Sequence, residues 1–177
     1  MSARKPLSVR LRNLVHKPAL AARRWWLIRV YGMRIGEGCR ISTTAKLDKT
    51  NPRGVVIGDH TYLTFGATVL THDFVNRKHM DTRIGSYCFI GCRTVIMPGV
   101  TIGDHCIIGA GTLVREDVPD RCIVVGNPGR IVKRGIDTIH WGLLPRDWEE
   151  RIPLKPGETR DPETGEIRSP EDRRPDA

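Results

Sequence analysis

Aliphatic residues recur every six positions through the middle of this sequence. Between residues 84 and 114 the series has no gap, and glycine directly follows four of its six members. A period of six fits neither a helix nor an alternating strand, and it is typical of a parallel β-helix in which three hexapeptides make one coil. The full series is Ile35, Ile41, Leu47, Ile57, Leu63, Val69, Ile84, Ile90, Ile96, Ile102, Ile108 and Val114.

The six-residue spacing breaks twice, and each break predicts a segment that leaves the coil. Ten positions separate Leu47 from Ile57, so we expect residues 48–54 to form a turn or short loop. Fifteen positions separate Val69 from Ile84, which predicts an extruded loop with His72 at its base. Insertions in solenoids often collect on the binding face. The second break is therefore the expected place of the functional site.

The repeats divide the chain into four predicted regions. Residues 35–133 form the β-helix, and residues 1–34 form a basic, amphipathic helical arm or cap that Pro18 interrupts. Residues 134–154 are expected to pack back on the core, whereas residues 155–177 are rich in proline and charge and are expected to be disordered. The residues expected to pack back are Trp141, Leu143, Leu144, Trp148 and Ile152.

Positive charge is concentrated at the start of the chain. Residues 1–34 contain nine Lys or Arg and no acid, and the remainder carries 20 groups of each sign. A nucleic-acid-binding domain would need a basic patch on its folded body, so we expect no nucleic-acid partner. Two interpretations of the arm stay open: a helix that caps the end of the solenoid, or contact with an anionic membrane surface around Trp25 and Trp26.

Cysteines and apolar segments bear on the compartment. The sequence has five cysteines without CxxC spacing, and Cys39, Cys88 and Cys106 fall on the small-residue position of the repeat. They are expected to pack as small hydrophobic residues in a reducing, cytoplasmic protein. No apolar run is long enough to span a bilayer, and no secretory signal is expected. Lipid contact by the arm would place the protein at the inner face of the membrane.

Several motifs in residues 35–133 together resemble the hexapeptide-repeat acyltransferases. They are the six-residue series, Thr71-His72-Asp73 before the loop, Pro98–Asp104, Ile108–Gly111 and Gly126-Asn127-Pro128. Within that family the chain is most similar to the sugar and polysaccharide O-acetyltransferases, such as the maltose and galactoside acetyltransferases. The resemblance implies an all-β, left-handed parallel β-helix and a homotrimer with active sites between subunits. It also implies acetyl-CoA as the donor, no metal, and a sugar, polysaccharide or glycolipid precursor as the acceptor.

The resemblance implies roles for residues at the second break. His72 aligns with the catalytic histidine of the family, and an imidazole suits the removal of a proton from an acceptor hydroxyl. Thr71, Asp73 and His79 are candidate substrate-binding residues, and His79 is the alternative base. Either Asp73 or a backbone carbonyl is expected to fix the tautomer of His72.

The resemblance also implies a binding site for coenzyme A. Cys92 would lie beside the thioester and offer its backbone N–H to the oxyanion, and Ala110 would leave space for the pantetheine arm. Arg130 and Lys133 match basic residues near the phosphates. The family often has a Thr-Lys pair where this chain has Arg115-Glu116. Arg115 is therefore the expected substitute for one contact with coenzyme A.

Other functions are weighed against this one. The acceptor could be an amine, on an amino sugar or a xenobiotic. A covalent route through Cys92 lacks any sequence feature that would activate the thiol. A zinc enzyme of the γ-carbonic anhydrase type would need three protein ligands. Enough imidazoles are present in His60, His72, His79 and His105. However, His60 and His105 are expected at solvent-facing corners. A non-catalytic scaffold would not need the loop around His72.

Overall fold

Each hexapeptide forms a strand of two or three residues that ends in an aliphatic side chain buried in the core. The computed structural model describes residues 20–145, 159–160 and 167–168. All twelve aliphatic residues of the six-residue series end a strand, and all of them are buried. Burying one such side chain contributes roughly 1.5–3 kcal/mol. The ladder of aliphatic residues is therefore the core of the coil, as the spacing predicts.

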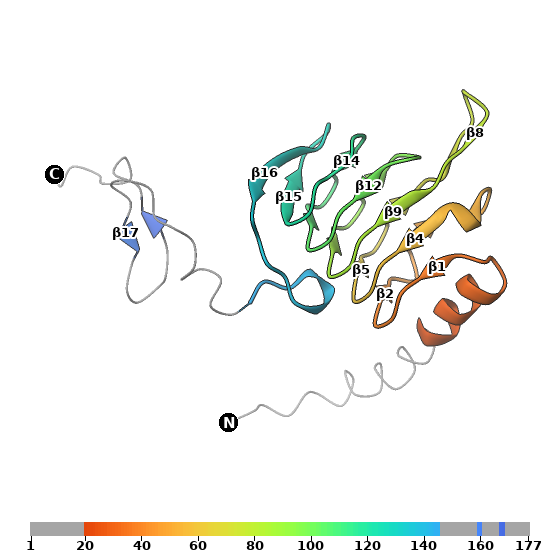
Figure 1. Cartoon of the computed structure of the whole chain (residues 1–177), viewed down its shortest axis with the longest axis horizontal. Coiled ribbons are helices and arrows are strands. Elements are labelled where there is room, and N and C mark those ends of the chain that lie inside the picture. Colours follow the sequence, from red (N-terminus) through yellow and green to blue (C-terminus); the bar gives the residue numbers. More distant parts are fainter. Residues whose placement is uncertain (1–19, 146–158, 161–166, 169–177) are drawn as a thin grey trace. The chain divides into compact units, whose positions relative to one another are not determined.

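The strands stack into three faces of a parallel β-helix (Figure 1). Face 1 consists of β1 (Arg34–Ile35), β4 (Val55–Ile57), β9 (Thr82–Ile84) and β12 (Thr101–Ile102). Face 2 consists of β2 (Arg40–Ile41), β5 (Tyr62–Leu63), β10 (Phe89–Ile90), β13 (Ile107–Ile108), β15 (Cys122–Val125) and β16 (Arg130–Arg134). Face 3 consists of β3 (Lys46–Leu47), β6 (Thr68–Val69), β11 (Val95–Ile96) and β14 (Leu113–Val114).

Register within each face is strict. In face 3, for example, Leu47 pairs with Val69, and Ile96 pairs with both Val69 and Val114. Within the three faces all pairs are parallel except the closing pair β15–β16, which is antiparallel and has a register shift between Ile123 and Val124. The chain passes from face 1 to face 2 to face 3 in each coil, which creates three edges. We call them edge 1–2, edge 2–3 and edge 3–1.

A C-terminal strap, residues 135–143, runs back along edge 1–2. It contains the short 3-10 helix η2 (His140–Gly142). Thr138 donates a hydrogen bond of 2.6 Å to the carbonyl of Tyr87, whose ring is stacked between His60 and His105 at centroid distances of 5.2 and 5.1 Å. His60 and His105 have positive φ and are corner residues, as expected, but their rings are only partly exposed and do not simply face solvent. The strap thus covers one of the three edges.

Trp141 anchors the end of this strap to the first coil. Its indole N–H donates to the carbonyl of Gly38 at 2.8 Å, and the guanidinium of Arg40 lies 3.2 Å from the centroid of its ring. The prediction for Leu143 is wrong, because this side chain is about half exposed at the end of the strap. Trp148 and Ile152 lie outside the described residues.

Removing the Trp141 side chain should loosen the strap without disturbing the coils. Trp141→Ala eliminates one hydrogen bond and one cation–π contact, so we expect the free energy of unfolding to fall by about 1–2 kcal/mol. Urea denaturation at fixed protein concentration measures this change. Ile139→Ala is the matched control, because it shortens an exposed side chain in the same strap. It should lower the free energy of unfolding by less than about 0.5 kcal/mol. Equal effects of both substitutions would contradict the anchoring role.

A helix over residues 20–29 lies against the first coil (Figure 1). Leu27 is buried in the hydrophobic core. Arg24 donates 2.7 Å to the carbonyl of Gly36, and Arg23 donates 2.7 Å to the carbonyl of Ala45. Burial lowers the pKa of Arg23. Residues 1–19, the remainder of the predicted arm, lie outside the described residues.

The second unit begins at Leu144. Its described part contains β17 (Thr159–Arg160) and β18 (Ile167–Arg168), which pair antiparallel. The rest of residues 155–177, for which disorder is predicted, lies outside the described residues.

Candidate active site

The extruded loop is a β-hairpin on edge 3–1. It leaves the coil after β6 as β7 (His72–Asp73) and returns as β8 (Lys78–His79), with His72 paired to His79. Two bonds close its base: the N–H of Met80 donates to the carbonyl of Thr71 at 2.9 Å, and the hydroxyl of Thr82 donates to the carbonyl of Leu70 at 2.5 Å. These bonds therefore hold the base of the hairpin that carries His72.

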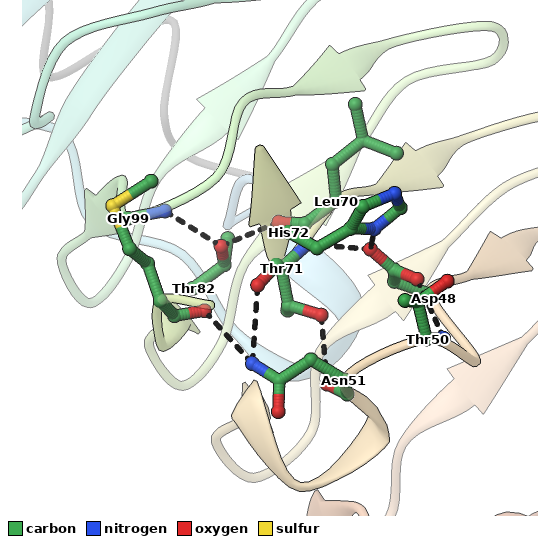
Figure 2. A network of polar contacts seen from close by, with 9 residues as sticks. Asp48, Thr50, Asn51, Leu70, Thr71, His72, Thr82 and Gly99 are labelled. Atoms are coloured by element: carbon green, nitrogen blue, oxygen red, sulfur yellow. Dashed lines mark hydrogen bonds and ion pairs between the residues drawn. The ribbon is translucent and has the colours of Figure 1, made fainter. Parts of the chain in front are cut away.

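Asp48 binds the imidazole of His72, as Figure 2 shows. Its carboxylate contacts Nδ1 of His72 and accepts the backbone N–H groups of Thr71 and Thr50, each at 2.9 Å. The side chain of Asp48 is only 4% exposed. Burial raises the pKa of this carboxyl group, but the hydrogen bonds from Thr71, His72 and Thr50 outweigh burial and lower it to about 2. Asp48 is therefore ionised near neutral pH.

The ionised partner fixes the tautomer of His72. A carboxylate only accepts hydrogen bonds, so Nδ1 of His72 carries a proton, and in the neutral imidazole the lone pair is on Nε2. The side chain of His72 is 28% exposed, so the ring is held at one nitrogen and open to ligands beyond Asp48. A buried carboxylate behind an exposed imidazole is an arrangement suited to general-base catalysis.

The first break in the spacing builds the support for His72. The loop contains the 3-10 helix η1 (Pro52–Gly54). The amide of Asn51 donates to the carbonyls of Thr71 and Met80 at 3.1 and 3.4 Å, and the hydroxyl of Thr71 donates to the carbonyl of Asn51 at 2.7 Å (Figure 2). Residues 48–54, expected to form a turn or short loop, therefore supply Asp48 and Asn51 to the site.

Thr71 and Asp73, both predicted to bind substrate, make different contacts from those expected. Thr71 is fully buried and hydrogen-bonded to Asn51, so it positions the hairpin instead of offering its side chain to a substrate. Asp73 does not contact His72; its carboxylate accepts the side-chain and backbone N–H groups of Asn76 at 2.6 and 3.1 Å. The side-chain bond from Asn76 is the main reason that the pKa of Asp73 is lowered. Asp48 takes the orienting role that was considered for Asp73.

An open cleft of about 660 Å³ lies beside His72. His79 lines it from the opposite strand of the hairpin, so the structure brings the two histidines to one cleft. The hairpin tip is apolar and almost fully exposed at Phe74 and Val75. The lining residues are Thr50, His72, Asp73, Phe74, Val75, Arg77 and His79.

Cys92 and Ala110 lie on a different edge. Both follow strands of face 2, β10 and β13, and precede strands of face 3, so they stack on edge 2–3. The N–H of Gly111 donates to the carbonyl of Cys92 at 2.8 Å. Among the described residues, neither the backbone N–H of Cys92 nor that of Ala110 has a hydrogen-bond acceptor. Within one chain these two residues are thus separated from His72 by face 3.

The basic residues predicted for phosphate binding lie toward the last coil. Arg115 and Arg130 line one small cleft of about 200 Å³ together with Glu116 and Gly129. Arg130 approaches Glu116 at 4.0 Å, an exposed and therefore weak contact. Lys133 belongs to β16, where Ile123 is its partner. All five cysteines are in the described part, and none forms a disulfide.

The described residues contain no group of three His, Cys, Asp or Glu side chains that could hold a metal ion. The four histidines considered for zinc are divided between edges: His60 and His105 are stacked with Tyr87 on edge 1–2, whereas His72 and His79 lie on the hairpin. Within one chain, that division separates the imidazoles that a γ-type zinc site would have to bring together.

Ionisation of Asp48 should make stability depend on pH. Its folded-state pKa of about 2 is below the ordinary value of 3.8, so its contribution is complete above the ordinary value and is lost as pH falls toward the folded value. The difference corresponds to about 2 kcal/mol. We expect the gap in unfolding free energy between wild type and Asp48→Asn to narrow between about pH 5 and pH 2.5 in urea denaturation. A gap that stays constant would contradict this assignment.

The family of the chain follows from its relatives. The family model "Bacterial transferase hexapeptide (six repeats)" matches residues 81–116. Protein CapG of Staphylococcus aureus is 38% identical over 117 residues, which cover 60% of this chain and 68% of CapG. The chain belongs to the hexapeptide-repeat transferase family. A putative acetyltransferase, YvoF of Bacillus subtilis (strain 168), is 33% identical over 110 residues; the match covers 60% of this chain and 64% of YvoF, slightly less than two thirds of that relative.

Solved structures agree with the fold. A maltose O-acetyltransferase from Clostridium difficile 630 is 25% identical with a TM-score of 0.52, covering 64% of this chain and 75% of that one. The hexapeptide-repeat acetyltransferase VCA0836 from Vibrio cholerae has the same TM-score of 0.52 at 22% identity, covering 65% of this chain and 80% of that one. These likenesses place the β-helix among known acetyltransferase folds.

Proposed function

We propose that this chain is an acetyl-CoA-dependent O-acetyltransferase that acts on a hydroxyl group of a sugar or glycan. One observation carries the proposal: a buried, ionised carboxylate from Asp48 holds Nδ1 of His72, and His72 lines an open cleft. An alcohol is a poor nucleophile until its proton is removed, and this pair is built to remove it. YvoF is named a putative acetyltransferase, which supports transfer of an acetyl group. The name of the maltose O-acetyltransferase supports a sugar hydroxyl as the acceptor.

The reaction follows from these groups. Nε2 of His72 takes the proton of the acceptor hydroxyl while its oxygen bonds to the thioester carbonyl carbon. The backbone N–H of Cys92 donates to the resulting oxyanion; one such donor typically contributes about 10²–10³-fold in rate. When the carbon–sulfur bond breaks, the imidazolium returns its proton to the departing thiolate. Asp48 stabilises the imidazolium between these two steps.

The separation of the two edges supports a site shared between copies. His72 is on edge 3–1, whereas Cys92 and Ala110 are on edge 2–3. The strap occupies the remaining edge. A head-to-tail contact in which edge 3–1 of one chain meets edge 2–3 of the next brings the groups together. Three copies close such contacts into a ring, so we propose a homotrimer of left-handed β-helices.

The donor's phosphates need positive charge. Arg115, Arg130 and Lys133 provide it near the last coil, and Ala110 leaves space for the pantetheine arm between them and Cys92. Glu116 lies close to Arg130 and opposes phosphate binding there. We propose that Arg115, Arg130 and Lys133 together contact the phosphates.

Thiol release from acetyl-CoA, measured with the full chain across mono- and oligosaccharides, tests the proposal. The acceptors should include acidic sugars, because Arg77 lines the cleft. We expect mild alkali to release the acetyl group from the product, because esters hydrolyse under these conditions and amides do not. An alkali-stable product would indicate transfer to an amine. No acceptor-dependent thiol release with any sugar would contradict the proposed function.

A further inference from the structure

The helix over residues 20–29 turns an unusual face away from the coil. Its inner side buries Leu27. Its outer side exposes Trp25 and Trp26, at 62% and 48%, and the following turn exposes Val30 at 59%. A surface helix of a globular protein normally turns polar residues outward. This apolar outer face has no partner within the described residues apart from the edge contact of Trp26 with Tyr31.

A positive charge lies beside this face. Arg29 is exposed on the helix, and the first acid of the chain is Glu37. Five further Lys or Arg precede the helix in residues 1–19. A second copy would bring the same cations against each other, so self-association through this face is electrostatically unfavourable. An anionic surface is the complementary partner.

A groove next to the tryptophans combines the same two chemistries. It has a volume of about 510 Å³ and lies between the helix and the first coil. Trp25, Ile28 and Ile41 supply apolar walls, and Arg29 supplies a guanidinium group. Phospholipid interfaces present phosphate groups directly above acyl chains, and tryptophan and arginine are favoured at that depth.

We infer that the Trp25–Trp26–Val30 face, with Arg29, docks on an anionic lipid surface. The described residues include no helix long and apolar enough to cross a membrane. Docking by a short helix and neighbouring cations is the mode in which apolar burial and charge attraction add. The inference does not depend on the proposed reaction.

Vesicle cosedimentation of the full chain tests the inference. We expect binding to vesicles of phosphatidylcholine mixed with phosphatidylglycerol, and at least about tenfold weaker binding to phosphatidylcholine alone. The double variant Trp25→Ser/Trp26→Ser should lose about tenfold or more in affinity for the anionic vesicles. Arg29→Gln should lose about fivefold, the contribution on the order of one cation near an anionic surface. Acetyl transfer to a soluble acceptor should be unchanged in these variants.

Val132→Ser is the matched control, because it removes an exposed apolar side chain from β16 instead of the helix. It should bind vesicles like the wild type. Brominated acyl chains should quench tryptophan fluorescence of the wild type and much less that of the double variant, which retains Trp141 and Trp148. Unchanged vesicle binding by the double variant would overturn the inference. The inference would also be overturned if the wild type self-associated with rising concentration without binding vesicles, and the double variant did not self-associate.

Discussion

His72→Ala is expected to lower kcat by about 10²–10⁴-fold, the usual contribution of a positioned general base. The folded chain should persist, because His72 is partly exposed and contributes no core packing. Affinity for acetyl-CoA should change little, since the donor is proposed to lie along edge 2–3. Steady-state thiol release and calorimetric binding of acetyl-CoA to the same preparation separate the two effects.

His79→Ala is the matched control for this loss. It removes a second imidazole from the same cleft, and His79 is paired with His72 across the hairpin. We expect it to raise KM for the acceptor and to leave kcat within about tenfold. If His79→Ala abolishes turnover while His72→Ala keeps it within threefold of wild type, the base has been assigned to the wrong histidine.

Asp48→Asn should be nearly as damaging although Asp48 does not touch the substrate. The amide N–H of asparagine can donate to Nδ1, which favours the tautomer with the proton on Nε2 and removes the lone pair needed for catalysis. We expect kcat to fall by about 10²–10³-fold with KM almost unchanged, the pattern of a lost transition-state interaction. Steady-state kinetics across a range of acceptor concentrations provide both constants.

Asp73→Asn tests whether the effect is specific to Asp48. Asp48 is close to His72 in space, and Asp73 is its neighbour in the sequence. The Asp73 carboxylate, however, binds Asn76 at the hairpin turn. We expect kcat of Asp73→Asn to stay within about threefold of wild type, because the His72 tautomer is held elsewhere. Equal losses in the two variants would mean that general charge near the cleft, and not orientation by Asp48, supports the reaction.

Much of the fold is readable from spacing, because a solenoid repeats one local rule. Every aliphatic residue of the series ends a strand, and the break after Val69 does produce an extruded segment. The segment is a paired hairpin, which spacing alone did not indicate. The exposed Leu143 and the long contact from Trp141 to Gly38 depend on where the strap ends, and no local pattern encodes that end.

The orienting carboxylate was missed because stacking, not sequence proximity, brings it to the site. Asp48 and His72 are 24 positions apart, and residues 48–54 have the composition of an ordinary turn. A signal was nevertheless present. Both breaks follow strands of the same face, β3 and β6, whose last residues Leu47 and Val69 are register partners. Breaks at equivalent positions on successive coils must lie next to each other, so their polar residues were candidates for one site.

Each active site is proposed to combine His72 from one chain with the Cys92–Ala110 edge of another. Two inactive variants test it together. His72→Ala removes the base, and Ala110→Trp blocks the donor's path at an exposed position that the fold tolerates.

Coexpression of the two variants in equal amounts is the decisive measurement, with specific activity compared to each variant alone. In randomly mixed rings, about one site in four joins an intact His72 to an intact edge 2–3, so we predict recovery to about a quarter of wild-type activity. If both halves of the site come from the same chain, no mixed site is intact, and the coexpressed protein will be as inactive as its parents.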